Sequence, residues 1–257
     1  MDGASHLQPG AVPRRLASSA RLFSQAGFEA LQSARVGVVG LGGVGSWAAE
    51  ALARSGAGAL VLVDLDHVAE SNLNRQVQAT LASLGVHKGL ALKDRIGLLN
   101  PDCRVEVIDA FLDEENASSI LAEADFWIDA CDDLAAKRAM VLQFPDKTRE
   151  RHLVVCGGAG GKTDPTRIRA ADLGSTHQDP LLSKLRYQLR RSHGFRREGR
   201  MRVPTVYCEQ NPVSTPDCSP AARLACAGYG SLVTVTAALG LAAAAEMMRR
   251  ITSAPPR

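Results

Sequence analysis

A glycine-rich segment early in the chain has the composition of a phosphate-binding loop. The sequence VGVVGLGGVG places Gly40, Gly42 and Gly45 in a G-x-G-x-x-G spacing directly after an apolar run, with Gly43 between them. Glycine lets the backbone turn tightly and approach an anion, and the free N–H groups at the start of a following helix attract negative charge. A glycine turn that only packs a helix against a sheet is the alternative. The spacing therefore indicates a phosphate site but does not identify the nucleotide.

Charged side chains follow the glycine-rich segment at distances that suit a nucleotide. Asp64 closes the second apolar run, and an acid about twenty residues beyond such glycines binds ribose hydroxyls. NAD, FAD and ATP all contain ribose, so Asp64 does not distinguish them. Arg75 and Lys88 come next. A triphosphate attacked at its α-phosphorus needs such cations, because charge builds on the departing pyrophosphate. The two cations therefore favour ATP, with solvated surface charge as the alternative.

The residues from Asp64 onward carry a more specific pattern, D-x-D-x-V-x-x-S-N-L-N-R-Q. This string resembles the signature of the superfamily that includes the molybdopterin- and thiamine-synthesis adenylyltransferases and the ubiquitin-activating enzymes. The resemblance implies that Asp64 binds ribose and that Asn72, Arg75 and Lys88 contact the phosphates of ATP. Asp66 is expected to orient Arg75 or Lys88. Without the resemblance, Asn72 could instead cap a helix or close a turn.

Two further segments resemble the same superfamily. The run I-D-A-C-D, which ends at Asp132, resembles a strand-end motif whose last aspartate holds magnesium, so Asp132 is expected to bind Mg²⁺. A role as N-cap of the helix predicted to start at Asp133 is the alternative. The segment R-L-F-S-Q, which begins at Arg21, resembles a stretch whose arginine reaches the ATP of a partner subunit. The resemblance thus implies a homodimer in which Arg21 completes the site of the other subunit.

The cysteines and two later segments narrow the substrate. Many members of the superfamily carry two C-x-x-C zinc pairs, and most activate the C-terminal glycine of a small ubiquitin-like protein. This chain has six scattered cysteines and no C-x-x-C pair, so a structural zinc site is not expected. Residues 157–168 and 178–186 look like segments of the tRNA threonylcarbamoyladenosine dehydratases, and this resemblance spans roughly residues 20–250. It implies that tRNA carrying threonylcarbamoyladenosine is the substrate.

Two other functions remain as alternatives. The first is activation of a ubiquitin-like or sulfur-carrier protein, against which the missing zinc pairs argue. The second is a nicotinamide dehydrogenase or a nucleotide-binding module without activity, against which Arg75 and Lys88 argue. A sulfur-transfer or carrier protein is also a possible partner of the dehydratase itself.

A basic stretch in the latter half suits an RNA substrate. One acidic residue, Glu198, stands among eight cations in residues 184–202. The cations are Lys184, Arg186, Arg190, Arg191, Arg196, Arg197, Arg200 and Arg202. Such a cluster can neutralise several phosphates of a folded RNA, although a solvated helix and loop would have the same composition. Tyr187, Phe195 and Tyr207 are the nearby aromatic residues that could stack on an unpaired base.

The resemblance implies a reaction in two steps. The threonyl carboxylate attacks the α-phosphorus of ATP, which gives an acyl-adenylate and pyrophosphate. The carbamoyl group then closes on the activated carbonyl and expels AMP, and this step needs little from the protein because both groups belong to one molecule. Cys208, Cys218 and Cys226 could accept an acyl group, as thiols do in some relatives; buried, inert thiols are the alternative.

Alternating apolar runs and helical patterns must position these residues. Strands are predicted at residues 36–39, 59–63, 104–108, 126–128 and 153–155. Helices are predicted between them at residues 46–55, 86–99, 114–122 and 133–144, and a later polar helix is predicted at 180–191. The alternation predicts an α/β fold with a Rossmann-like, mostly parallel sheet, helices on both faces and a C-terminal insertion and crossover region.

The remaining segments are predicted to join this sheet in one unit. Residues 1–20 are predicted as a mobile arm and 21–257 as a single ATP-binding adenylation domain, with a basic insertion at about 160–225 and a C-terminal helix at about 229–251. The net charge of +3 is too small to indicate nucleic-acid binding by itself. Scattered cysteines favour a cytoplasmic location. Residues 231–248 are Ala-rich but contain Glu246, which predicts a buried or docking helix, with membrane contact as the alternative.

Overall fold

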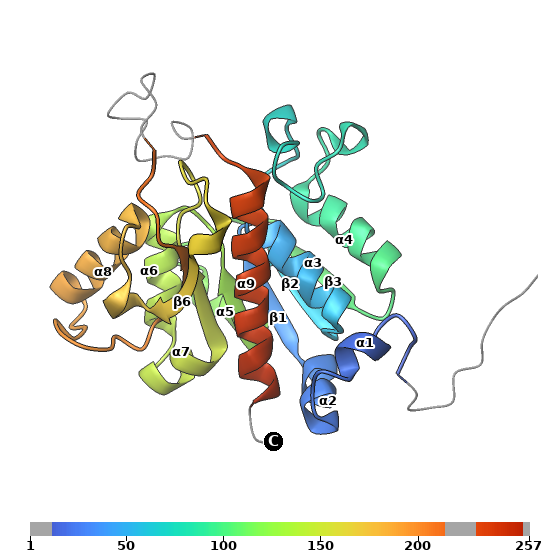
Figure 1. Cartoon of the computed structure of the whole chain (residues 1–257), viewed down its shortest axis with the longest axis horizontal. Coiled ribbons are helices and arrows are strands. Elements are labelled where there is room, and N and C mark those ends of the chain that lie inside the picture. The colour runs from blue at the N-terminus through green and yellow to red at the C-terminus, as the bar shows by residue number, and fades with distance from the viewer. Residues whose placement is uncertain (1–11, 214–229, 254–257) are drawn as a thin grey trace, which may run out of the picture.

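The computed structural model describes residues 12–213 and 230–253, and a seven-stranded sheet forms its centre (Figure 1). The strands are β1 (Arg35–Val39), β2 (Ala59–Val63), β3 (Arg104–Ile108), β4 (Phe126–Asp129), β5 (Leu153–Cys156), β6 (Ile168–Asp172) and β7 (Pro204–Cys208). Their spatial order is β3-β2-β1-β4-β5-β7-β6. Neighbouring strands are parallel, except that β6 runs antiparallel to β7 at one edge. The predicted α/β fold with a Rossmann-like, mostly parallel sheet is confirmed.

The central strands are apolar along their length because both faces of the sheet are covered. The sequences RVGVV of β1 and ALVLV of β2 are buried at nearly every position. Parallel strands in this environment lose the alternation of polar and apolar residues that a half-exposed strand shows. Val38 lies in register with Leu62 on one side and Ile128 on the other. The sheet interior is therefore fixed by branched aliphatic residues on three adjacent strands.

Helices enclose the sheet and form a separate hydrophobic core on each face. One face is covered by α2 (Gln25–Ser33), α3 (Gly45–Ser55), α4 (Lys88–Leu99) and α9 (Val233–Thr252), and the other by α5 (Ala117–Leu121), α6 (Leu134–Gln143) and α8 (Pro180–Ser192). The short α7 (Asp146–His152) leads into β5. In Figure 1, α9 runs across the front of the molecule and packs against α3. A Cβ at Gly240 would lie 2.3 Å from the Val44 carbonyl oxygen, so this glycine brings α9 close to the glycine-rich turn.

The predicted elements are found close to their predicted positions, and two strands are additional. The five predicted strands correspond to β1–β5, and the predicted helices correspond to α3–α6 and α8. Strands β6 and β7 were not predicted, and they lie in the region predicted as an insertion. Neither strand is a long apolar run: β6 contains Arg169 and Asp172, and β7 begins with Pro204. Proline at the first position of a strand does not interrupt the hydrogen-bond ladder, so the sheet continues through it.

The described parts of the predicted N-terminal arm and C-terminal helix both contain helical structure. Residues 12–20 of the predicted arm include the short helix α1 (Ala17–Ala20), and the Leu16 side chain is buried. Arg15 donates a hydrogen bond to Asn100 and pairs with Asp102. Residues 1–11 lie outside the described residues. The predicted C-terminal helix is represented by α9, and within the described ranges no helix is long and apolar enough to cross a membrane.

Candidate active site

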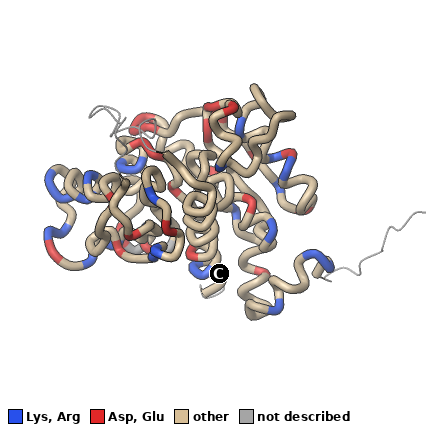
Figure 2. Tube along the Cα trace, turned by 45° about the horizontal axis from the view of Figure 1, so that its top comes forward, with Lys and Arg blue, Asp and Glu red and all other residues tan. Residues whose placement is uncertain are grey.

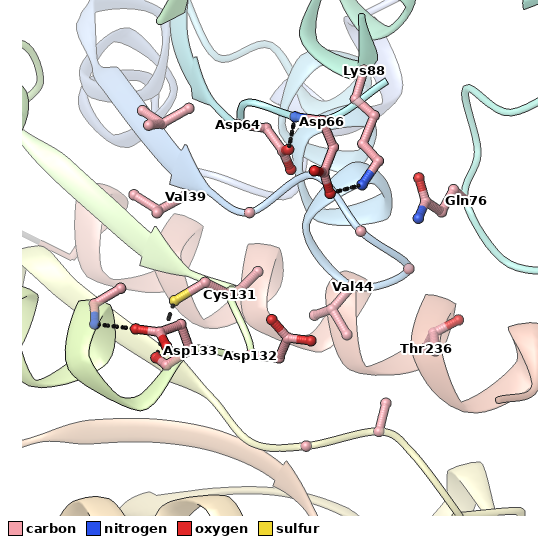
Figure 3. A pocket seen from close by; sticks show the side chains of 18 of the residues that line it. Val39, Val44, Asp64, Asp66, Gln76, Lys88, Cys131, Asp132, Asp133 and Thr236 are labelled. Carbon is pink, nitrogen blue, oxygen red and sulfur yellow. Dashed lines mark hydrogen bonds and ion pairs between the residues drawn. The ribbon is translucent and has the colours of Figure 1, made fainter. Parts of the chain in front are cut away.

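A cavity of about 310 Å³ opens where the strand order reverses, at the carboxyl ends of β1 and β4 (Figure 3). The loops that leave two such strands diverge, and nucleotides bind in the crevice between them. Gly40 allows the two strand ends to approach, because its φ is +84° and a Cβ there would lie 2.8 Å from the Cys131 backbone. The cavity lining includes most of the predicted site residues. They are Gly40, Gly42, Gly43, Asp64, Asp66, Asn72, Arg75, Lys88 and Asp132.

The glycine-rich turn has two different requirements for glycine. Gly45 is the first residue of α3, and a Cβ there would lie 1.9 Å from the Gly40 carbonyl oxygen. This position requires glycine for the turn itself. A Cβ at Gly42 would meet no atom within 4 Å, and Gly42 lines the cavity. Gly42 therefore keeps space free in the cavity rather than satisfying the turn.

Asp64 connects the phosphate turn to the loop after β2. One carboxylate oxygen accepts the Leu41 N–H at 2.5 Å, and the other accepts the Asp66 N–H at 2.9 Å. Each oxygen has a second lone pair, so the carboxylate is held by the backbone and can still accept from ribose hydroxyls. The geometry therefore suits the predicted role of Asp64 as a ribose ligand.

Lys88 and Asp66 form an ion pair on the same side of the cavity, with 2.7 Å between the Lys88 Nζ and an Asp66 carboxylate oxygen (Figure 3). The Lys88 side chain is 8% exposed and that of Asp66 is 57% exposed. Of the two cations that Asp66 was expected to orient, the contact is thus with Lys88. Asp66 holds the ammonium at the cavity edge, where a phosphate could compete for it.

His87 fixes the helix that carries Lys88, and the sequence analysis missed this residue. Its Nδ1 accepts the Gly89 N–H at 3.1 Å and so caps α4. The proton must then be on Nε2, which lies 3.0 Å from the Asp64 carbonyl oxygen and donates to it. The ring thereby links the predicted ribose acid to the predicted phosphate lysine. Histidine is not a common N-cap residue, so the sequence offered no signal for it.

Arg75 and Asn72 come from the loop that begins with the 3₁₀ turn η1 (Glu70–Asn72). The Arg75 guanidinium donates to the Ser71 carbonyl at 2.7 Å and to Asn74 Oδ1 at 2.9 Å. Asn72 Oδ1 accepts the Ala69 N–H at 3.0 Å. Asn72 therefore closes a turn, which was the alternative to phosphate binding that its sequence position left open. Because Asn72 also lines the cavity, its amide nitrogen is the group available to a phosphate.

The sequence left open whether Asp132 caps the following helix or is available to Mg²⁺, and the structure assigns the capping to Asp133. Asp133 caps α6, because its Oδ1 accepts the Ala136 N–H at 2.7 Å. Asp132 is exposed, and its side chain lies between the glycine-rich turn and the loop after β5 (Figure 3). Among the described residues, no group of three His, Cys, Asp or Glu side chains could hold a metal ion. Mg²⁺ commonly binds through one or two carboxylates and takes its other ligands from substrate phosphates and water, so Asp132 fits that use.

A buried ion pair lies beneath Asp132. Lys137 Nζ is 2.9 Å from Asp129 Oδ1, both side chains are fully buried, and the ammonium also donates to the Cys156 carbonyl at 2.8 Å. Cys131 donates its S–H to the same Asp129 oxygen. Burial and the Asp129 charge raise the pKa of the Cys131 thiol well above its ordinary value. Cys131 is therefore a protonated hydrogen-bond donor at neutral pH and not a thiolate nucleophile.

The loop after β5 forms the opposite side of the cavity, and a second buried ion pair holds it. Lys162 Nζ lies 2.8 Å from Asp179 Oδ2, and the same oxygen accepts the Gly158 N–H at 3.0 Å. Asp179 Oδ1 accepts the Leu182 N–H at 3.0 Å and so caps α8. The two segments that resembled the dehydratases therefore meet at one carboxylate. This pair was not predicted, although an aspartate before proline at a helix start was a usable signal.

The predicted basic stretch runs along α8 and the loop that follows it (Figure 2). Leu182, Leu185 and Leu189 form the buried face. Some of the cations have structural contacts: Arg186 donates to the carbonyls of Leu173 and Thr176. Other members are exposed to solvent. They are Lys184, Arg191, Arg196, Arg197 and Arg200, the last of which pairs with Glu150 at 2.6 Å.

The aromatic candidates for base stacking differ in exposure. Tyr187 is 59% exposed, and the Arg191 guanidinium carbon lies 5.8 Å from the centre of the Tyr187 ring. Phe195 packs under Arg149, and Tyr207 is buried. Of the three predicted residues, Tyr187 is therefore the one exposed enough to stack on a base, although Arg191 contacts its ring and its hydroxyl.

Within the described part of the chain, Arg21 and Cys208 are not part of the cavity lining. Arg21 is exposed directly after α1, and its role toward a partner subunit stays a prediction. Cys208 is buried, and burial raises the pKa of its thiol. It is therefore a poor nucleophile. Cys218 and Cys226 lie outside the described residues.

The chain is similar to known proteins over nearly all of its length. The ThiF family matches residues 14–257. The tRNA threonylcarbamoyladenosine dehydratase of Haemophilus influenzae is 37% identical over 245 residues, which is 93% of each chain. The crystal structure of the E. coli tRNA N6-threonylcarbamoyladenosine dehydratase, TcdA, in complex with ATP has a TM-score of 0.82 at 36% identity and 93% coverage of each chain. The molybdopterin-synthase adenylyltransferase of E. coli is 37% identical over 120 residues, or 47% of this chain and 48% of that protein.

Proposed function

The chain belongs to the ThiF family, and from this premise we propose that it is an ATP-dependent enzyme that dehydrates threonylcarbamoyladenosine in tRNA. One observation carries the proposal. The cavity has a glycine turn and the Lys88–Asp66 pair on one side, and on the other a loop tied by Asp179 to a basic helix. A single cavity therefore joins a nucleotide site to a surface suited to RNA. Relatives named as this dehydratase cover almost the whole chain, whereas the carrier-protein adenylyltransferase covers about half of it.

The proposed reaction begins when the threonyl carboxylate attacks the α-phosphorus of ATP. A carboxylate–phosphorus bond forms, and the bond to pyrophosphate breaks. The carbamoyl group of the same nucleoside then attacks the activated carbonyl, a proton is lost, and AMP leaves with the former carboxylate oxygen. The nucleoside has then lost one water in total, while ATP has become AMP and pyrophosphate. Both reacting groups of the second step are held in one molecule, which favours ring closure.

We assign the residues of the first side to the nucleotide. The glycine turn and Asn72 orient the phosphates, and Asp64 accepts from the ribose. Lys88 and Arg75 meet the negative charge that develops on pyrophosphate. The Lys88–Asp66 distance of 2.7 Å supports this assignment, because the pair holds the ammonium in place before ATP enters. A preorganised cation loses little free energy to reorganisation during the reaction.

Asp132 is the residue that we assign to Mg²⁺. When bound there, the metal would neutralise negative charge on the phosphates. Asp132 itself is free for this role because Asp133 performs the helix capping. The buried Lys137–Asp129 pair fixes the strand end from which Asp132 projects.

The proposal includes a homodimer in which Arg21 of each subunit reaches the ATP of the other. The exposed position of Arg21 outside its own cavity supports this arrangement. We also propose that residues 21–257 form one adenylation domain with residues 1–20 as an arm. The protein would act in the cytoplasm, and a sulfur-transfer or carrier protein would be an additional partner rather than the substrate.

ATP–pyrophosphate exchange distinguishes the substrate classes. The purified chain would be incubated with ATP, Mg²⁺ and labelled pyrophosphate, together with threonylcarbamoylated tRNA, unmodified tRNA or a small carrier protein with a C-terminal glycine. The proposal expects exchange only with the modified tRNA. Exchange driven by the carrier protein would contradict the proposal and support the alternative adenylyltransferase. Removal of Mg²⁺ with EDTA should abolish the exchange.

A further inference from the structure

The Lys162–Asp179 pair occupies an unusual place between the cavity and the basic helix. The two side chains are 1% and 0% exposed, and Lys162 also donates to the Cys208 carbonyl at 2.8 Å. Asp179 uses its two oxygens in different directions: Oδ1 caps α8, and Oδ2 holds the Gly158 N–H. A Cβ at Gly157 would lie 2.5 Å from Asp179 Oδ2, so this loop is packed directly against the carboxylate.

We propose that Lys162 and Asp179 are positioning residues that transmit RNA docking on α8 to the cavity loop at residues 157–160. This inference rests on the proposed function, because it assumes that α8 binds the tRNA. The loop lines the cavity opposite the Lys88–Asp66 pair, and Leu181 of α8 lines it as well. In the proposed arrangement, the threonyl carboxylate reaches the α-phosphorus from the side formed by the loop and the first turn of α8.

The distances along α8 suit such a link. A helix rises about 1.5 Å per residue, so Arg191 is about 15 Å along the axis from Leu181. RNA phosphates bound by the exposed cations of α8 would thus lie within one helix length of the reacting atoms. Because Asp179 holds the start of α8 and the loop with one carboxylate, a shift of the helix must move the loop.

The chemistry of the pair also argues for a positioning role. A buried ion pair is weak support for stability, because an apolar replacement of similar volume is often equally stable. The three donors of Lys162 and the four lone pairs of Asp179 instead define directions. Two of the lysine donors are used, by Asp179 and by the Cys208 carbonyl at the end of β7. The pair thus fixes the loop against both α8 and the sheet edge.

The double variant Lys162→Met, Asp179→Asn removes the contact of residue 179 with the loop, here called the tether, and keeps its capping of α8. Asparagine caps helices about as well as aspartate, so its Oδ1 can still accept the Leu182 N–H. Its amide nitrogen replaces the oxygen that accepted from Gly158, so the tether is lost, and no charge remains buried without a partner. Asp172→Asn is the matched control. Asp172 also caps a 3₁₀ turn, η4 (Leu173–Ser175), and also accepts from backbone N–H groups, but the residues it holds, Met201 and Val203, do not line the cavity.

Hydrogen exchange with an unmodified tRNA transcript as probe tests the link without requiring turnover. In the unsubstituted protein, RNA should slow exchange in α8 and also in residues 157–161. In the double variant, RNA should still protect α8 but no longer the loop. The single-turnover rate with modified tRNA and saturating ATP should fall about tenfold, because the reacting groups are less well placed, while the Kd for ATP changes less than twofold.

Three outcomes would overturn the inference. One is a loop that RNA protects equally in the double variant and the unsubstituted protein, and another is an unchanged single-turnover rate. The third is an equal loss in the Asp172→Asn control or a parallel loss of ATP affinity, either of which would indicate general destabilisation. If the unsubstituted protein itself fails to convert modified tRNA, the proposed function is wrong. A double variant with normal turnover contradicts only the positioning role.

Discussion

The cavity has two walls that are built in different ways. The nucleotide wall consists of Gly40, Gly42, Gly43, Asp64, Asp66 and Lys88, and its charged groups reach the cavity directly. The substrate wall consists of residues 157–160 and Leu181, which are glycines and apolar residues. Its charged groups, Lys162 and Asp179, are buried behind it. One wall is thus suited to bind and neutralise charge, and the other is suited to hold a position.

A buried lysine–aspartate pair lies behind each side of the cavity. Lys137 pairs with Asp129 and donates to the carbonyl of Cys156, the last residue of β5. Lys162 pairs with Asp179 and donates to the carbonyl of Cys208, the last residue of β7. Each buried lysine therefore satisfies a strand-end carbonyl and orients one carboxylate. The difference is what each carboxylate holds: Asp129 fixes the strand end before Asp132, and Asp179 fixes a loop and a helix together.

The largest effect is expected on the nucleotide wall at Lys88. Lys88→Ala should lower turnover on the order of a hundredfold with the fold intact, because one preorganised cation is lost from the pyrophosphate. Arg75→Ala should behave in the same way. Lys93→Ala is the matched control, since Lys93 is an exposed lysine on the same helix. Steady-state kinetics and circular dichroism provide the measurement, and unchanged ATP–pyrophosphate exchange in both variants would remove these two cations from the mechanism.

A smaller effect is expected from filling space in the nucleotide wall. Gly42→Ala adds one methyl group that meets no protein atom within 4 Å, so the melting temperature should not fall. The methyl group would occupy space next to the phosphates, and ATP binding should weaken about tenfold, which corresponds to about 1.4 kcal/mol. Gly97→Ala on α4 is the control, because a Cβ there also meets nothing. Calorimetric titration that shows equal ATP affinity in the two variants would contradict the placement of phosphate beside Gly42.

Removal of exposed cations near the substrate wall should change how strongly tRNA binding depends on salt. The double variant Arg196→Ala, Arg197→Ala should weaken tRNA binding about fivefold and lower the slope of log affinity against log salt by about two, one for each lost phosphate contact. ATP affinity should not change. Arg104→Ala, an exposed cation on the far edge strand β3, is the control. Filter binding over a series of salt concentrations that gives the same slope for all proteins would exclude this loop from the RNA surface.

The smallest effect is expected at Cys131, although it lines the cavity. Burial beside Asp129 raises the pKa of this thiol, so it stays protonated and is unreactive at neutral pH. Cys131→Ser keeps a donor to Asp129, and turnover should remain within about twofold. Alkylation of Cys131 by iodoacetamide should be slow at pH 7 and should need a higher pH than an ordinary thiol, since the thiolate is the reactive form and the pKa of this thiol is raised. Rapid labelling at pH 7 with loss of activity would contradict this account.

The sequence could predict which residues line the nucleotide wall because most of them follow strands that the sequence itself shows. The glycine spacing, Asp64 and Asp132 each come shortly after a strand, and parallel strands bring their carboxyl ends to one edge of the sheet. The substrate wall could not be predicted in this way. Lys162 meets Asp179 only because β5, β7 and α8 pack together, and β7 was not recognised as a strand.

The roles of some individual side chains could not be predicted because they depend on contacts in the folded protein. Which of two adjacent aspartates caps α6 is decided by a single hydrogen bond, from the Ala136 N–H to Asp133. Arg186 looked like part of an RNA surface, but it donates to carbonyls within the fold. Composition shows how many cations a segment has, but neighbouring backbone determines which of them remain free.

Nucleoside mass analysis after incubation of the protein with threonylcarbamoylated tRNA, ATP and Mg²⁺ tests the central claim most directly. The account predicts that the modified adenosine loses the mass of one water, and that AMP and pyrophosphate each form in a one-to-one ratio with the cyclised product. An unchanged nucleoside mass under conditions in which the protein binds both ATP and the tRNA would contradict it.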